Sequence, residues 1–192
     1  SMIKRRIDGP WFFIADTHFE DPGVLRRAGM DYSAAAILGR TENMIRAWNE
    51  VVPPDGVVMH AGDVSLHCTT RRLREILERL NGTILLAEGS HDETALQCRD
   101  RFGAICDTFM LYHKAINTHI FVAHHCHKVW PLSHYGSWHI HGHSHGGLND
   151  YAAREGKIVD AYSPQPIPLS RIEEIMATRP ENFNSIRRRR LQ

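Results

Sequence analysis

The stretch that decides the fold class is residues 57–92, VVMHAGDVSLHCTTRRLREILERLNGTILLAEGSHD. It begins with an apolar run at 57–60 and contains a second at 83–87, and both runs have the length of a buried strand. Between them, apolar residues with helical spacing predict a helix over 70–80, namely Leu73, Ile76, Leu77 and Leu80. A strand, a helix and a strand in this order predict parallel neighbouring strands and an α/β fold.

The same alternation extends towards the N-terminus. Residues 11–15 form another apolar strand, and Ser33 caps a helix that runs to about Val52 and stops at Pro53. The second half of the chain is richer in strands, which we expect at 104–112, 118–123, 138–141 and 157–161. Its last helix is predicted to run from a capping box, Ser170-Arg171-Ile172-Glu173, to about Thr178.

Length and composition indicate one globular domain. The chain has 192 residues, 42% hydrophobic and 23% charged, with a net charge of +1, so its overall charge does not favour nucleic acid or acidic membranes. It has no apolar run near the ~18 residues of a membrane span and no signal-peptide core at its start, so we expect a cytoplasmic protein. We predict a single domain over 2–180 and a flexible Arg-rich tail over 181–192.

Histidine is the compositional outlier. The chain contains 14, and ten of them fall between His113 and His145. Histidine is the commonest metal ligand and the usual general acid or base near neutral pH. This enrichment points to metal chemistry or proton transfer.

Four polar motifs lie close behind the predicted strands: Asp16-x-His18, Gly62-Asp63, Gly89-Ser90-His91-Asp92 and Gly142-His143-Ser144-His145. In open α/β sheets, ligand sites lie beyond the carboxyl ends of the strands. Carboxylates and imidazoles are metal donors, and alternate residues of an extended segment face the same side. Each motif also has a plain structural interpretation as a capped or glycine-bearing turn.

The motifs differ in specificity. In a chain of this composition the first arises about 0.8 times by chance, the third about 0.06 times and the fourth about 0.07 times. A sixth donor comes from the histidines after the strand at 118–123. Spacing alone does not choose between His124, His125 and His127.

Together these blocks resemble the calcineurin-like metallophosphoesterases, and in particular their small bacterial and phage members. Their order matches the family pattern over about 130 residues, from Asp16 to His145. The string from His124 to Trp130, followed by Gly136-Ser137-Trp138, is also similar to those small members, and this likeness favours His124 over His125.

The resemblance implies a four-layer α/β/β/α sandwich with a dinuclear metal site. One ion would be held by Asp16, His18 and His145, and Asp63 would bridge to a second ion. His124 and His143 would hold that second ion, with help from the residue at position 90. His91 would lie beside the substrate as the proton donor, and Mn²⁺ is the ion most expected, with Fe, Zn, Ni or Co as alternatives.

One position departs from the family pattern. Where the family carries an asparagine that reaches the second ion, this chain has Ser90, whose hydroxyl is shorter and a weaker donor. The second ion would then be bound through water, bound more loosely, or lost.

The function implied is hydrolysis of phosphomono- or phosphodiesters by a hydroxide that bridges the two ions, with His91 and Asp63 as the catalytic residues. The expected substrate is a phosphorylated small molecule or a nucleotide. Two alternatives stay open. The chain is a catalytically weak family member that acts as a binding protein, or it is a nucleic-acid processing phosphodiesterase that uses Arg187 to Arg190 as a backbone anchor.

Overall fold

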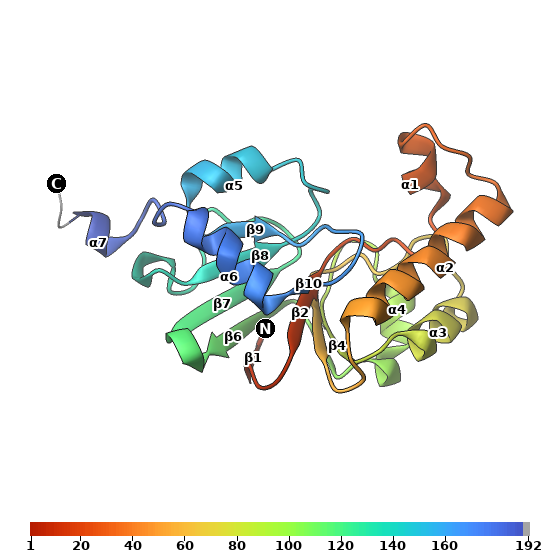
Figure 1. Cartoon of the computed structure of the whole chain (residues 1–192), viewed down its shortest axis with the longest axis horizontal. Coiled ribbons are helices and arrows are strands. Elements are labelled where there is room, and N and C mark those ends of the chain that lie inside the picture. Colours follow the sequence, from red (N-terminus) through yellow and green to blue (C-terminus); the bar gives the residue numbers. More distant parts are fainter. Residues whose placement is uncertain (190–192) are drawn as a thin grey trace.

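The structure, a computed structural model, describes residues 1–189, with side chains as far as residue 187. Two five-stranded sheets form its centre, in the orders β1-β6-β7-β8-β9 and β10-β2-β3-β4-β5 (Figure 1). The strands are β1 (Met2–Arg6), β2 (Trp11–Ile14), β3 (Val57–His60), β4 (Thr83–Ala87), β5 (Ala104–Cys106), β6 (Thr108–His113), β7 (Thr118–Ala123), β8 (Trp138–His141), β9 (Ile158–Asp160) and β10 (Ile167–Pro168). The helices are α1 (Pro22–Arg27), α2 (Ala34–Val51), α3 (Thr70–Arg79), α4 (Glu93–Gln97), α5 (Asn149–Glu155), α6 (Leu169–Thr178) and α7 (Ile186–Arg189).

The βαβ prediction from residues 57–92 is confirmed. Strands β2, β3, β4 and β5 run parallel, and α3 connects β3 to β4. Helices α2 and α3 cover the outer face of this sheet, where Trp48 and Ile76 are buried against Val58 and Leu86. Ser33 caps α2 through its side chain, which accepts a hydrogen bond from the amide of Ala36.

The two sheets pack face to face. Phe13, Met59 and Leu85 of one sheet and Leu111 and Val122 of the other belong to a single buried cluster. Helix α6 adds to this cluster and packs against β2, β9 and β10. On the outer face of the second sheet, α5 contacts β9, opposite the side on which Figure 1 shows α2, α3 and α4. The predicted α/β class is therefore confirmed.

Two predicted elements are wrong in detail. The single strand at 104–112 is two strands, since β5 pairs with β4 in one sheet and β6 pairs with β1 and β7 in the other. Both halves are apolar, so periodicity does not reveal the crossing at Asp107. The capping box at Ser170 does not form either, because α6 begins at Leu169 and Glu173 contacts Nε2 of His113 at 2.6 Å.

The segment from residue 181 differs from the tail that we predicted. Asn182 is buried, and its amide nitrogen donates to the carbonyl oxygens of Ser133 and Ser137. Its side-chain oxygen accepts from the amide of Lys157, and α7 follows at residues 186–189. Residues up to 185 are thus part of the packed structure, and Arg190 of the predicted basic run lies outside the described residues.

Within residues 1–189, no helix has both the length and the apolar character that crossing a membrane requires.

Candidate metal centre

The polar motifs converge because the strands that carry them end at one edge. Asp16 and His18 follow β2, Asp63 follows β3, and Gly89 to Asp92 follow β4. From the second sheet, His124 follows β7, and His143 and His145 follow β8. Each motif therefore lies at the carboxyl end of a strand, where α/β folds place ligand sites.

Asp63 is the centre of the cluster. Its Oδ2 atom lies 3.4 Å from Nε2 of His18 and 3.5 Å from Nε2 of His124. Oδ1 of Asp16 lies 3.9 Å from Nε2 of His18 and 3.6 Å from Nε2 of His145. The two carboxylates and three imidazoles thus form a continuous line of donor atoms across both sheets.

Three sets of side chains in this line have the spacing of metal donors. Within each set the ligand atoms lie within 4.8 Å of one another: Asp16, His18 and His145; Asp16, Asp63 and His124; and His124, His125 and His143. Asp16 and His124 each belong to two sets, so the sets share members and adjoin.

Several atoms of the cluster are buried without a hydrogen-bond partner among the described residues: Asp16 Oδ1, His18 Nε2 and His124 Nε2. The other ring nitrogens are occupied, since Nδ1 of His18 donates to Asp21 at 3.0 Å and Nδ1 of His124 donates to the carbonyl of Ala61 at 2.7 Å. Each Nε2 therefore presents a lone pair to the centre in the neutral ring. Unpaired buried polar atoms are costly, and a divalent ion could satisfy this carboxylate oxygen and these two imidazole nitrogens.

The backbone at the cluster is held in an unusual conformation. A positive φ is uncommon outside glycine, and here it occurs at five of the predicted metal ligands. These are Asp16 (53°), His18 (44°), Asp63 (60°), His143 (68°) and His145 (47°). These residues stand in the turns that directly follow the strands. One hydrogen bond links two of the turns, since the amide of His143 donates to Oδ2 of Asp16 at 2.9 Å.

Two glycines leave room for these side chains. A Cβ at Gly62, where φ is +99°, would lie 2.5 Å from Nδ1 of His124. A Cβ at Gly89 would lie 2.5 Å from Oδ1 of Asp63. Glycine is thus required at both positions by the close approach of His124 and Asp63.

The protonation of the cluster reflects its charges. Burial raises the pKa of the Asp16 carboxyl to about 7, and the charge of Asp63 acts in the same direction. Burial also opposes ionisation of Asp63, but the nearby imidazoles of His124 and His18 outweigh it and hold that pKa well below its usual range. The pKa values of His18 and His124 are raised in return. The cluster as a whole therefore favours bound positive charge, whether protons or metal ions.

The structure brings six of the predicted ligands together, and it distinguishes the three candidate histidines after β7. His124 is buried at the centre, whereas Nδ1 of His127 contacts the carbonyl of His125 and lies outside the three sets. His143 is exposed, and its donor atom groups with those of His124 and His125.

His91, the predicted proton donor, and Ser90, the predicted weak donor to the second ion, are both exposed. The amide of His91 donates to Oδ1 of Asp63 at 2.9 Å, and its exposed ring lies 6.4 Å, between centroids, from that of His18. Ser90 is exposed between Gly89 and His91. Among the described residues, no hydrogen bond forms to its hydroxyl.

Sequence reasoning missed the groups that support the candidate ligands. Asp21 orients the ring of His18, and Arg40 donates to the carbonyl oxygens of Thr17 and His18 at 2.8 and 2.9 Å. Asp160 accepts from the amide of Gly146 in the loop that carries His145. Of these residues, only Asp21 lies in a recognisable local pattern, Asp21-Pro22-Gly23, which begins helix α1.

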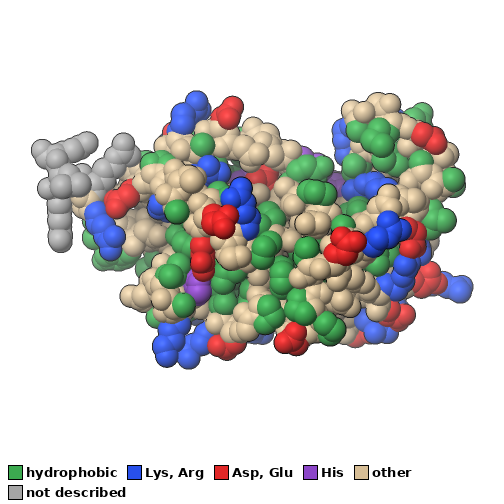
Figure 2. Space-filling model, in the orientation of Figure 1, with side chains coloured by type: hydrophobic (Ala, Val, Ile, Leu, Met, Phe, Trp, Pro, Cys, Tyr) green, Lys and Arg blue, Asp and Glu red, His purple; other side chains and the backbone are tan. Residues whose placement is uncertain are grey.

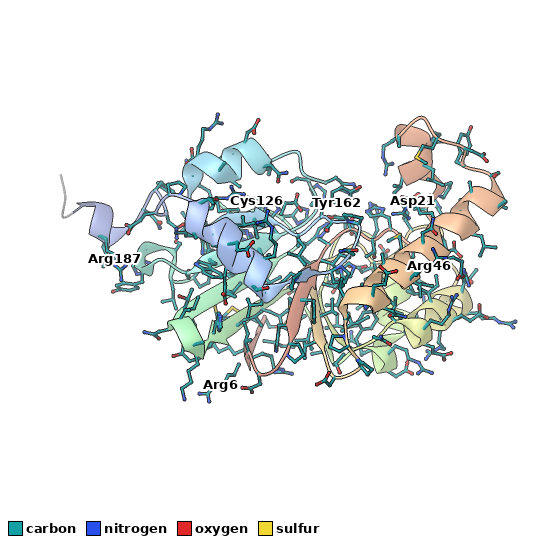
Figure 3. The ribbon with its side chains drawn as sticks, in the orientation of Figure 1. Arg6, Asp21, Arg46, Cys126, Tyr162 and Arg187 are labelled. Carbon is teal, nitrogen blue, oxygen red and sulfur yellow. The ribbon has the colours of Figure 1, made fainter. Side chains whose placement is uncertain are left out.

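A cavity of about 750 Å³ adjoins the cluster and shares Asp16 with it. Its walls are mainly apolar side chains of α1 and α2, including Leu25 and Met44, together with Tyr162, whose ring stacks on His145 at 4.8 Å. Figure 2 shows histidine side chains at the base of the notch beside α1, and Figure 3 shows Tyr162 and Asp21 on its two sides.

Comparison with known proteins gives relatives without an assigned function. No family model matches the chain. It is 28% identical over 155 residues to the uncharacterized protein MJ1445 of Methanocaldococcus jannaschii, covering 78% of this chain and 76% of that protein. It is also similar to the crystal structure of AQ665, a protein of unknown function from Aquifex aeolicus, with a TM-score of 0.67 and 20% identity over 88% of this chain and 100% of that one. The second likeness concerns the fold alone.

Proposed function

We propose that this protein is a metal-dependent phosphoesterase with a dinuclear centre, built on the four-layer sandwich of the calcineurin-like metallophosphoesterases. The observation that carries the proposal is the position of Asp63 Oδ2, 3.4 and 3.5 Å from two imidazole nitrogens. Those two nitrogens have no hydrogen-bond partner in the described part of the chain. A carboxylate between two such donors is the arrangement that a shared, bridging ligand needs.

The donors divide between two ions. Asp16, His18 and His145 would hold the first, Asp63 would be shared, and His124 and His143 would hold the second. Mixed imidazole and carboxylate donors suit Mn²⁺, which we propose as the ion, with Fe, Zn, Ni or Co as alternatives.

The charge of the site supports a phosphate substrate. When bound, two divalent ions supply the positive charge that attracts a phosphoryl group and acidifies the attacking water. The two ions would carry a charge of +4 and the carboxylates of Asp16 and Asp63 a charge of −2. The site would therefore keep a net positive charge that attracts an anionic ester. His91 is exposed and its amide donates to Asp63, so we propose its ring as the proton donor to the leaving oxygen.

The cavity beside Asp16 bears on the substrate. Its apolar walls and the ring of Tyr162 suit an ester whose organic group is aromatic or apolar, such as a nucleotide or another phosphorylated small molecule. Its volume falls within the range of small-molecule pockets.

Ser90 favours one alternative. If the second ion is lost for want of a donor at this position, the chain binds one ion and a phosphorylated partner without hydrolysis. Turnover near zero with every metal, in a protein that still binds its ligand, would support this second function.

The proposal is tested by loading the purified protein with Mn²⁺ and measuring bound metal together with hydrolysis of an aryl phosphodiester and an aryl phosphomonoester. We expect about two ions per chain, and activity that a chelator removes and added Mn²⁺ restores. Absence of bound metal, or of hydrolysis with each of Mn²⁺, Fe²⁺, Zn²⁺, Ni²⁺ and Co²⁺, would contradict it. A panel of nucleotides, cyclic nucleotides, short RNA and phosphopeptides then identifies the substrate class.

A further inference from the structure

The donor set of the proposed second ion contains a histidine that the family pattern does not supply. His125 follows His124 directly, yet its ring does not point away from the cluster. The ring centroid of His125 lies 4.4 Å from that of His143 and 4.9 Å from that of His124. One donor atom from each of these three residues lies within 4.8 Å of the other two.

The backbone explains how two consecutive histidines can face one site. Strand β7 ends at Ala123, so the alternation of side chains that a strand imposes ends there too. The rings of His124 and His125 meet edge to face, at 81°, instead of lying on opposite sides of a sheet. His124 is buried below the site, and His125 is exposed beside it.

The position that should complete the second ion's shell carries a weak donor. Ser90 is exposed, and its hydroxyl has a shorter reach than an amide oxygen. Without a further group, Asp63, His124 and His143 are three donors for an ion that usually takes four or more.

We propose that His125 is a ligand of the second metal ion and takes the place of the donor that Ser90 does not provide. The inference rests on the proposed dinuclear function. It assigns to the second ion three imidazoles and the shared carboxylate of Asp63, whereas the first ion keeps two imidazoles, Asp16 and the shared carboxylate.

This donor set makes the two metal positions unequal. Imidazole suits Zn, Fe and Ni, and carboxylates suit Mg and Mn. The second position therefore prefers a metal such as Zn²⁺ over Mn²⁺ more strongly than the first does. A protein offered both metals fills the second position with Zn²⁺.

The test is a titration of the metal-free protein with Zn²⁺, monitored by calorimetry, with no substrate present. Elemental analysis after dialysis then counts the bound ions. The variants are His125→Ala, Ser90→Asn and the double variant. The matched control is His119→Ala, which alters a histidine near the start of β7, the strand that precedes His125. His125 is exposed, so its replacement leaves the core intact, and circular dichroism verifies folding.

We expect two ions in the wild type and in His119→Ala. In His125→Ala we expect one ion to bind at least about 10- to 100-fold more weakly, the loss typical of changing a group around a metal site. The affinity of the other ion is unchanged. Adding Ser90→Asn to that variant restores the weakened site, because an amide oxygen then reaches the ion. Ser90→Asn alone changes little, since His125 already occupies that place.

Two results overturn the inference, and they are distinguishable. If His125→Ala binds two ions with wild-type affinities, His125 is not a ligand, but the phosphoesterase proposal survives. If the wild type binds fewer than two ions, the dinuclear proposal itself fails and takes this inference with it.

Discussion

Asp63 divides its two oxygens between two roles. Oδ1 accepts the amide of His91, which fixes the turn after β4, and Oδ2 faces the two imidazoles. Asp63→Asn keeps the size of the side chain but removes its charge. We expect both ions to be lost, with a fall in affinity larger than the about 10- to 100-fold seen for supporting groups, because the shared ligand serves both. Elemental analysis measures this, and a variant that keeps two ions would contradict the bridging role.

Unlike Asp63, His91 is proposed to act on the substrate and not on the metal, since its side chain lies outside the three donor sets. His91→Ala should bind metal as the wild type does and lose about 10²- to 10⁴-fold in rate, the usual contribution of a general acid. Hydrolysis and bound metal are measured on the same sample. Loss of metal in this variant would mean that His91 is a ligand and not a proton donor.

Five of the six candidate donors could be picked out from the sequence because they lie in short motifs behind apolar strands, and His124 was chosen through the resemblance to the family. The sequence did not resolve the roles of His124 and His125, since spacing says nothing about the turn that starts after Ala123. Asp21 was missed for a related reason. Its contact with His18 depends on how the chain enters α1, which no local pattern encodes.

At the scale of elements, Asp92 joins the turns that follow β3 and β4. Its carboxylate accepts from the amides of Asp63, Val64 and Gly89 at 2.7 to 2.9 Å, and it is buried. These contacts give Asp92, the last residue of the motif that begins at Gly89, a structural role.

Asp92→Ala leaves two buried amides and one part-buried amide without partners, each at a cost of about 1–3 kcal/mol. We therefore expect the free energy of unfolding to fall by at least about 3 kcal/mol, and metal affinity to fall with it as Asp63 loses its position. Urea unfolding of the metal-free protein measures the first effect. His119→Ala serves as the control, and an unchanged unfolding midpoint in Asp92→Ala would contradict this role.

The strands and helices predicted correctly are those whose own apolar residues show the spacing of a strand or a helix. Strands β2, β3 and β4 are short apolar runs, and α2 and α3 have a clear apolar face. Strand β1 was missed because it is an edge strand whose Lys4, Arg5 and Arg6 carry no apolar alternation. Likewise, the start of α6 follows from the pairing of β10 with β2, a tertiary contact that overrides the local capping signal.

At the scale of the whole molecule, the candidate site joins the two sheets. Asp16, His18 and Asp63 come from the sheet of β2 and β3, and His124, His143 and His145 come from the sheet of β7 and β8. Between these edges, the shared apolar core holds the sheets together. The sequence could not show this juxtaposition, because the sheets meet through side chains far apart along the chain.

A metal site that the fold builds from both sheets would exist only in the folded chain. At a free metal concentration 100 times the dissociation constant, one such ion stabilises the native state by about 2.7 kcal/mol. For a chain of this size that raises the melting temperature by roughly 5–11 °C. We expect this shift on adding Mn²⁺ to the metal-free protein, and its loss in Asp63→Asn.

The 14 histidines make this measurement discriminating. A histidine-rich chain can also bind metal when unfolded, and such binding reduces or cancels the stabilisation. If Mn²⁺ binds with the expected stoichiometry but leaves the melting temperature of the wild type unchanged, the ions are held by histidines without regard to the fold. If the shift persists in Asp63→Asn, the stabilising ions lie elsewhere. Only a shift that depends on Asp63 fits a centre that both sheets create, because that carboxylate lies between imidazoles contributed by each of them.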